Sequence, residues 1–149
     1  MYADNTAYPG YEDWLDTVDL SGNGVIIAIV DGGSDENHVD LAGQFVECEG
    51  QSCGGNASGS HGTHTAGIVG ATGASGKTDS YGFLRGQGVA PGVSLVEQTY
   101  SPTYQQPGGM TQLMTESLRN GASASSNSWG PSGSPQGYDI DTLEVDIGI

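Results

Sequence analysis

The chain has 149 residues, and 18 Asp and Glu against 3 Lys and Arg give it a formal net charge of −15. That charge repels phosphate groups, so we expect neither nucleic acid nor an anionic membrane as a partner. No apolar run reaches the roughly 18 residues that a membrane helix needs, so no membrane span is expected.

The first predicted elements are a short helix and a buried strand. Residues 11–18 carry apolar side chains at helical spacing before a Gly-rich turn. Residues 25–30 contain no polar side chain and are flanked by glycines, which predicts a central parallel strand buried on both faces. Asp31 follows at the carboxyl end of this strand, where open α/β sheets place their chemistry.

The next predicted elements alternate between helix and strand. Small residues in 61–70 predict a helix packed closely on the sheet, and the apolar stripe in 110–120 predicts an amphipathic helix that stops at a glycine. Strands are predicted over 93–98 and 122–128. This order predicts an α/β fold with a parallel sheet and right-handed crossovers.

Four segments carry motifs of a known family. Residues 31–41 read Asp-Gly-Gly-Ser-Asp-Glu-Asn-His-Val-Asp-Leu, 60–67 read Ser-His-Gly-Thr-His-Thr-Ala-Gly, 88–92 read Gly-Val-Ala-Pro-Gly, and 126–130 read Ser-Asn-Ser-Trp-Gly. In this order and spacing they resemble the subtilisin-like serine peptidases, or subtilases, from about Gly22 to Gly130.

The resemblance implies a serine-type endopeptidase in which Asp31 and His61 are two members of an Asp-His-Ser triad. In such a triad the histidine takes the proton of the serine hydroxyl, and the aspartate fixes the tautomer of the ring. The implied fold has three layers around a mostly parallel sheet. The family's Gly-Thr-Ser-Met-Ala block, which carries the nucleophile, does not occur in the chain, and neither does the segment with the oxyanion-hole asparagine.

Residues 1–149 are therefore expected to be the N-terminal portion of a single subtilase catalytic domain, with the nucleophile-bearing C-terminal portion absent. The expected partners are a protein or peptide substrate and the remainder of that domain. We expect the chain alone to be nearly inert. The alternative is a fragment or pseudoenzyme that folds like a subtilase and hydrolyses nothing.

The resemblance also implies a substrate-binding segment at Ser128, Trp129 and Gly130. In the family the backbone of this segment pairs with the substrate as an added strand, a mode that is independent of substrate sequence. Trp129 then lies beside the pocket for the residue before the scissile bond, or else it is a core aromatic. The resemblance places the opposing substrate strand loosely at Gly108–Met110.

Asp40 matches a position that ligates a structural calcium ion in many subtilases, and carboxylates suit such a cation. No cofactor is expected for catalysis. Cys48 and Cys53 lie in a polar loop and form either a disulfide, which we favour, or two free thiols. Together with the acidic composition, these features favour a secreted or extracellular protein.

The chain departs from the family motifs at two positions. Gly32 stands where the family has Ser or Thr after the aspartate, and Val39 replaces a common proline. His64, three residues after His61, has a spacing that zinc sites also use, but no Glu follows His61 as a metalloprotease requires, so we interpret His64 as a supporting residue.

Residues 71–78 fit a relaxed phosphate-loop pattern, with alanine at the first glycine position. Such a loop must lead into a helix whose amino end receives the phosphates. The residues that follow are too rich in glycine for that helix, so the pattern is a weak alternative.

Overall fold

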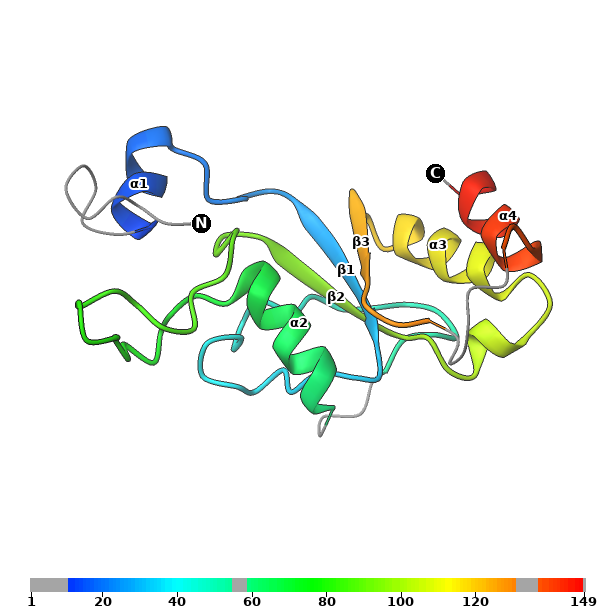
Figure 1. Ribbon diagram of the computed structural model, residues 1–149, viewed down its shortest axis with the longest axis horizontal. Coiled ribbons are helices and arrows are strands. Elements are labelled where there is room, and N and C mark those ends of the chain that lie inside the picture. Colours follow the sequence, from blue (N-terminus) through cyan, green and yellow to red (C-terminus); the bar gives the residue numbers. More distant parts are fainter. Residues whose placement is uncertain (1–10, 55–58, 131–136, 149) are drawn as a thin grey trace.

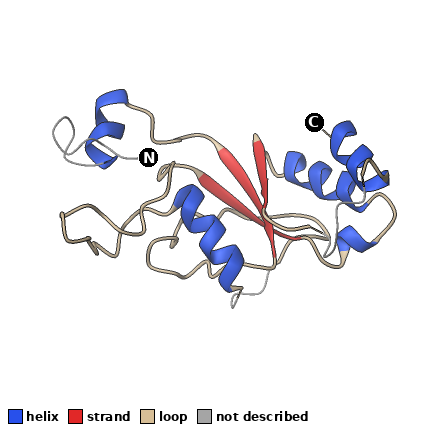
Figure 2. Ribbon diagram, viewed as in Figure 1, coloured by secondary structure: helices blue, strands red, loops and turns tan. Residues whose placement is uncertain are grey.

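The computed structural model describes residues 11–54, 59–130 and 137–148. Figure 1 shows a small sheet with helices on both sides, and Figure 2 shows that long loops join these elements. The elements in chain order are α1 (Tyr11–Val18), β1 (Ile26–Asp31), α2 (Ser60–Gly70), β2 (Ser94–Thr99), the 3-10 helix η1 (Thr103–Gln105), α3 (Gly109–Arg119), β3 (Ala124–Asn127) and α4 (Ile140–Ile147).

The sheet is three-stranded, with the order β2-β1-β3, and both strand pairs are parallel, as predicted. In register, Ile29 lies opposite Glu97, Asp31 opposite Thr99, and Val30 opposite Asn127. The central strand β1 is therefore the strand that the sequence marks as most apolar. Its carboxyl end, the carboxyl end of β2 and that of β3 all lie at one edge of the sheet.

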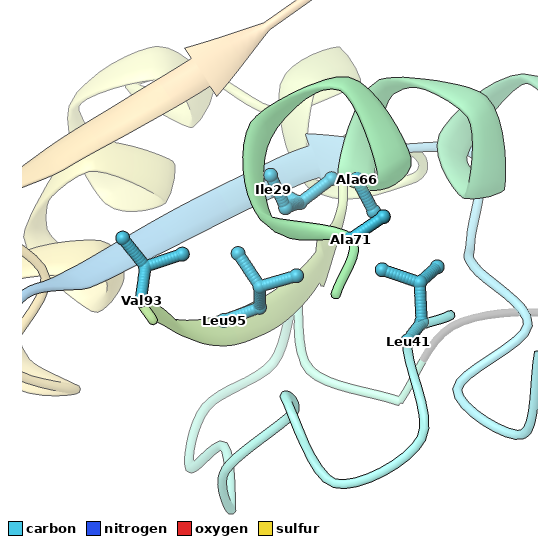
Figure 3. Packing of buried hydrophobic residues seen from close by; sticks show 6 residues of the cluster. All are labelled: Ile29, Leu41, Ala66, Ala71, Val93 and Leu95. Atoms are coloured by element: carbon cyan, nitrogen blue, oxygen red, sulfur yellow. The ribbon is translucent and has the colours of Figure 1, made fainter. Parts of the chain in front are cut away.

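Alternate residues of β1 face two different helical layers, because successive side chains of a strand point to opposite faces. Figure 3 shows one core cluster gathered between α2 and the strands. Each fully buried aliphatic side chain in such a cluster contributes about 1.5–3 kcal/mol. The cluster consists of Ile29, Leu41, Ala66, Ala71, Val93 and Leu95.

The opposite face of the sheet carries a second cluster under α3. Figure 1 shows α3 and α4 together on this side, away from α2. Three aromatic residues, Tyr100, Tyr104 and Trp129, pack at its margin. Its buried members are Ala28, Val30, Met110, Leu113 and Ala122. The result is the predicted three-layer arrangement.

The predicted elements differ from the observed ones mainly at their ends. β1 is shifted by one residue and includes Asp31, and β3 covers only 124–127 of the predicted 122–128. The expectation of a substrate strand at Gly108–Met110 is wrong. Gly108 is the left-handed residue before α3, with φ of 77°, and Gly109 already begins that helix.

Helix α4 was not predicted, although its amino end carries a recognisable signal. The Asp139 side chain accepts a hydrogen bond from the Thr142 backbone N–H at 3.0 Å, a typical N-cap. Within the described residues no helix is long and apolar enough to cross a membrane.

Candidate active site

The structure brings together the two residues that the sequence marks as acid and base. Asp31 is the last residue of β1, and His61 is the second residue of α2. The His61 Nδ1 atom lies 2.9 Å from Oδ1 and 2.8 Å from Oδ2 of Asp31. The carboxylate is buried, with 5% of its side chain exposed, whereas 62% of the imidazole is exposed. A buried acid thus orients an accessible base.

The Asp31 carboxylate has a further fixed hydrogen bond besides the one to His61. The Gly32 backbone N–H donates to its Oδ1 at 2.7 Å. The Thr65 hydroxyl lies 3.4 Å from Oδ2, but it lies only 3.0 Å from the Gly62 carbonyl oxygen. Because a hydroxyl has one hydrogen, the shorter bond to Gly62 takes it. The hydroxyl that Gly32 lacks is therefore not replaced by Thr65.

The amino end of α2 lies directly on the loop that follows Asp31. A Cβ atom at Gly59 would fall 2.0 Å from the Gly33 carbonyl oxygen, and one at Gly62 would fall 2.2 Å from the same atom. Real Cβ atoms do not approach oxygen so closely, so both positions require glycine. Gly62, the glycine of the Ser-His-Gly-Thr motif, therefore lets α2 approach the loop closely enough for His61 to reach Asp31.

Thr63 joins the same two segments by hydrogen bonds. Its hydroxyl donates to the Gly59 carbonyl oxygen at 2.6 Å and accepts from the Asp35 backbone N–H at 2.8 Å. The Asp31–Asp35 segment is thus attached to α2 through both backbone packing and a side chain.

This arrangement is suited to general base chemistry. A carboxylate that accepts from Nδ1–H leaves Nε2 as the atom that accepts a proton, because the hydrogen bond on one ring nitrogen sets the tautomer of the other. The exposed ring can therefore receive a proton from a group that approaches Nε2.

The predicted substrate-binding residues follow β3 at the same edge of the sheet. Ser128 and Gly130 are exposed, while Trp129 is partly buried. The Trp129 ring stacks on Tyr100 with centroids 4.8 Å apart, and it meets Tyr104 edge-on at 4.8 Å. Trp129 thus packs at the margin of the second core cluster, between two exposed residues.

Asp40 lies apart from the Asp31–His61 pair and joins two loops by hydrogen bonds. Its Oδ1 accepts a hydrogen bond from the Ser75 backbone N–H at 2.7 Å, and its backbone carbonyl accepts from Thr72 at 2.8 Å. The side chain is buried, and His38 Nδ1 lies 4.0 Å from Oδ2. Across the ranges that the structure describes, no group of three or more His, Cys, Asp or Glu is arranged to hold a metal ion.

His38, Asp40 and His64 line one groove of about 450 Å³ beside α2. His64 is exposed on the helix, as is His38 in its turn. The zinc spacing of His61 and His64 finds no support, because among the described residues no third His, Cys, Asp or Glu joins them in a metal-binding group.

The phosphate-loop hypothesis is wrong, because its helix is missing. Residues 72–93 are all described and contain no helix. Instead Thr78 and Leu84 form an antiparallel bridge, so the segment folds back on itself. No helix amino end is present there to receive a phosphate.

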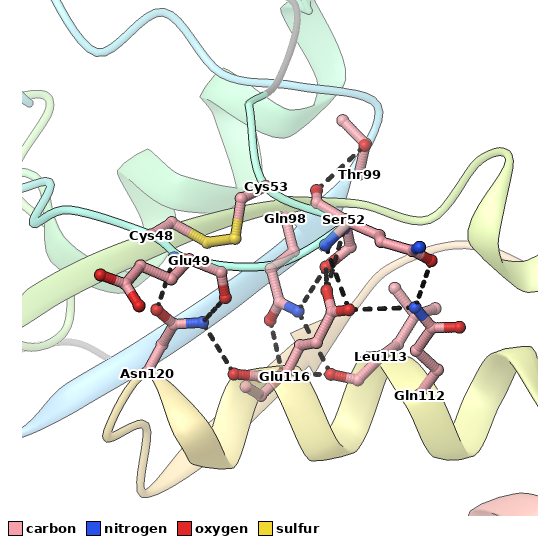
Figure 4. Close-up of a disulfide and its surroundings, with 12 residues drawn as sticks. Cys48, Glu49, Ser52, Cys53, Gln98, Thr99, Gln112, Leu113, Glu116 and Asn120 are labelled. Atoms are coloured by element: carbon pink, nitrogen blue, oxygen red, sulfur yellow. Dashed lines mark hydrogen bonds between the residues drawn. A yellow bond between two sulfur atoms is a disulfide. The ribbon is translucent and has the colours of Figure 1, made fainter.

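The favoured disulfide is present between Cys48 and Cys53. Figure 4 shows its loop lying against α3, where Glu116 reaches toward Ser52. The Glu116 carboxylate accepts hydrogen bonds from the Ser52 backbone N–H at 2.9 Å and from the Ser52 hydroxyl at 2.5 Å. The Gln98 amide donates to Ser52 Oγ at 2.8 Å, which extends the network to β2.

Glu116 is a buried carboxylate that the sequence analysis missed. Burial alone would raise the pKa of Glu116, but hydrogen bonds from Gln112, Ser52 and Gln51 outweigh burial and hold that pKa below its ordinary value of 4.5. Glu116 lies beside the apolar stripe of α3, three residues after Leu113. No signal in the sequence marks its burial, because its hydrogen-bond partner Ser52 is 64 positions away.

Comparison with known proteins assigns most of the chain to one group. The model of the subtilase family matches residues 22–146. Fervidolysin from Fervidobacterium pennivorans is 38% identical over an alignment of 86 residues, and the match covers 52% of this chain and 11% of fervidolysin.

Two solved structures resemble the fold. The Aeromonas sobria serine protease, in complex with a chaperone, has a TM-score of 0.61 and 21% identity, covering 91% of this chain and 23% of that protease. A psychrophilic protease has a TM-score of 0.56 and 24% identity, covering 86% of this chain and 43% of that protein. The chain therefore spans less than half the length of each of these relatives.

Proposed function

The chain belongs to the subtilase family, and from that premise we propose that it is the N-terminal portion of a catalytic domain that hydrolyses peptide bonds. The observation that carries this proposal is the contact of His61 Nδ1 with the Asp31 carboxylate, at 2.8 Å and 2.9 Å. In the proposed reaction Asp31 holds the tautomer and steadies the imidazolium, while His61 moves the proton.

The proposed reaction is a two-step acyl transfer. His61 Nε2 takes the proton of a serine hydroxyl as its oxygen attacks the peptide carbonyl, and then returns that proton to the departing amine. The acyl-enzyme is hydrolysed by water, with His61 as general base again. The serine belongs to the C-terminal remainder of the domain, because the family's nucleophile block does not occur in this chain.

An uncovered apolar groove supports a missing remainder as the partner. The groove has a volume of about 610 Å³ and lies along β1, β3 and α2, with Ile27, Ile68 and Ala124 among its lining residues. Ile68 and Val89 are more than half exposed there. Apolar surface of this kind is typical of a face that another segment covers.

The proposed substrate is an extended protein or peptide chain along Ser128–Gly130. Ser128 and Gly130 are exposed, so their backbone groups are accessible. The packing of Trp129 on Tyr100 supports this role, since it fixes the segment beside the end of β1. Backbone pairing makes binding independent of most substrate side chains.

A non-catalytic subtilase-like fragment is the alternative, and the absent nucleophile block favours it. A fluorophosphonate probe and a peptide hydrolysis assay distinguish the proposed peptidase from this alternative. We expect no adduct and no hydrolysis with the pure chain, but hydrolysis when it is paired with the nucleophile-bearing portion of a subtilase domain, such as that of fervidolysin.

That hydrolysis must disappear with Asp31→Asn and with His61→Ala in this chain. A serine adduct on the chain alone would mean that it holds a nucleophile outside the family motifs. A complex that forms, binds peptide and never cleaves it would support the non-catalytic alternative.

We further propose a secreted protein with a structural calcium ion at Asp40. The Cys48–Cys53 disulfide supports an oxidising compartment. Support for calcium is narrower, because Asp40 is a single carboxylate and one of its oxygens already accepts from Ser75. Backbone carbonyls would have to supply most of the six to eight ligands that calcium takes. Calcium should raise the melting temperature of the wild type and leave that of Asp40→Asn unchanged.

A further inference from the structure

A further buried carboxyl group, that of Glu97, lies against the loop that follows Asp31. Glu97 is on β2, opposite Ile29 and two residues before the register partner of Asp31. It is 5% exposed, and its Oε1 accepts a hydrogen bond from the Ser34 backbone N–H. Ser34 itself is 1% exposed. The bond is therefore shielded from water, where a hydrogen bond is stronger than in a solvated site.

Residues 32–35 are thus held from two sides. On the β2 side, Glu97 accepts a hydrogen bond from the Ser34 backbone N–H. From the other side, Gly62 lies against the Gly33 carbonyl, and Thr63 accepts from the Asp35 N–H at 2.8 Å. The segment that carries Asp31 is therefore placed between β2 and the helix that carries His61.

We propose that Glu97 is a positioning residue of the candidate active site. Its carboxylate anchors the Ser34 backbone, and this anchor keeps the Asp31 carboxylate on His61 Nδ1. The inference rests on the proposed function, in which this contact orients the general base.

A purely structural role for Glu97 would predict lower stability and nothing else. The tautomer of His61 separates the two roles, because it responds to the position of Asp31 and not to the overall stability of the fold. Long-range ¹H–¹⁵N correlation spectra of the ring report that tautomer in the 149-residue chain, at a pH well above the ordinary pKa of histidine.

Three variants of Glu97 divide the possibilities. Glu97→Gln keeps an oxygen that accepts from Ser34, Glu97→Leu removes the acceptor at similar size, and Glu97→Asp keeps the carboxyl group but draws the acceptor back by one methylene. Glu116→Leu is the matched control, because it also removes a buried carboxylate that accepts backbone hydrogen bonds, but it does so under α3.

We expect the Nδ1–H tautomer to dominate in the wild type, in Glu97→Gln and in Glu116→Leu. In Glu97→Leu it should give way to the mixture of a histidine whose ring has no fixed acceptor. If Glu97→Leu does not fold, Glu97→Asp takes its place with the same expected loss. In the assembled peptidase, kcat/KM should fall about 100-fold in Glu97→Leu and remain within a few-fold in Glu97→Gln.

An unchanged His61 tautomer in both Glu97→Leu and Glu97→Asp would overturn the inference. An equal loss of the Nδ1–H tautomer in Glu97→Gln would also overturn it, since that variant keeps an oxygen that accepts from Ser34. A mixed tautomer already in the wild type would instead contradict the Asp31–His61 pairing of the proposed function. A tautomer loss confined to the Leu and Asp variants, in a protein that never hydrolyses peptides, would retain the positioning role and reject the peptidase.

Discussion

The two faces of the sheet are packed against their helices by different kinds of contact. On the α2 face, beside the apolar cluster, the backbone at Gly62 contacts the Gly33 carbonyl and leaves no room for a side chain. On the α3 face, a network of polar side chains adjoins the apolar cluster, with Glu116 bonded to Ser52 and Ser52 to Gln98. The candidate active site lies on the first of these faces.

The two kinds of contact differ in how well they tolerate substitutions. Backbone packing sets the distance between β1 and α2 without adjustable atoms, so any added atom must move one of the two elements. A side-chain network can lose one hydrogen bond and keep the others. We therefore expect substitutions on the α2 face to act in an all-or-none way, and those on the α3 face to act by degrees.

Gly62→Ala tests the first half of this comparison and should have the largest effect. Its Cβ would fall 2.2 Å from the Gly33 carbonyl oxygen, so the helix must shift away from the loop. We expect a loss of about 3 kcal/mol or more in the free energy of unfolding, measured by urea denaturation. The Nδ1–H tautomer of His61 should be lost with it.

The matched control is Gly67→Ala in the same helix, where no atom lies within 4 Å of the added Cβ. It should stabilise the protein by about 0.5–1 kcal/mol, since alanine suits a helix interior better than glycine. Equal effects of Gly62→Ala and Gly67→Ala would show that close packing does not set the position of α2.

Removal of the disulfide tests how far the α3-face network can hold its loop alone. Cys48 and Cys53 are separated by five positions, and loop-closure entropy for so short a loop amounts to about 2 kcal/mol. We expect the double variant Cys48→Ser, Cys53→Ser to lose this amount and still fold cooperatively, because Glu116 continues to hold Ser52. Complete unfolding would mean that the covalent link, and not the network, fixes the loop.

Glu116→Gln examines a single member of the network and its pH dependence. Because the pKa of Glu116 in the folded protein lies below its ordinary value of 4.5, the ionised carboxylate stabilises the fold above that value. This stabilisation is lost as the pH falls through the folded-state pKa. We expect the variant to be about 1–2 kcal/mol less stable at neutral pH.

The difference in free energy of unfolding between the wild type and Glu116→Gln should narrow as the pH falls below 4.5, because protonation removes the charge of Glu116 from the wild type. Denaturation curves at a series of pH values measure this gap directly. A gap that stays constant into the acid range would contradict a lowered pKa of Glu116.

The sequence predicted the parts of the fold whose signal is local. The apolar run at 25–30 identified the central strand, and the Ser-His-Gly-Thr motif identified the helix that begins near His61. The pairing of Asp31 with His61 followed from a family resemblance and not from local pattern. Its distance was accessible only through the fold, because 30 residues separate the two side chains.

What the sequence missed is set by contacts between distant segments. Glu97 reads as a polar interruption of a strand, and only its approach to Ser34, 63 positions away, gives it a role. Gly108–Met110 was assigned an extended backbone, but Gly109 lies against the 3-10 helix η1 and opens α3 instead. Local patterns contain no information about such approaches.

The smallest expected effect concerns Gly32, where the chain departs from the family. No atom lies within 4 Å of a Cβ built at Gly32, so Gly32→Ser should change the free energy of unfolding by less than about 0.5 kcal/mol. Its neighbour Gly33 has a φ of 108°, which side chains rarely adopt, so Gly33→Ser should cost about 1–2 kcal/mol. Denaturation of both variants measures the contrast.

Because the Gly32 backbone N–H already donates a hydrogen bond to Asp31 at 2.7 Å, the hydroxyl added in Gly32→Ser should also leave the His61 tautomer unchanged. A large loss in Gly32→Ser would mean that the outer side of the loop is as tightly packed as the side that meets α2.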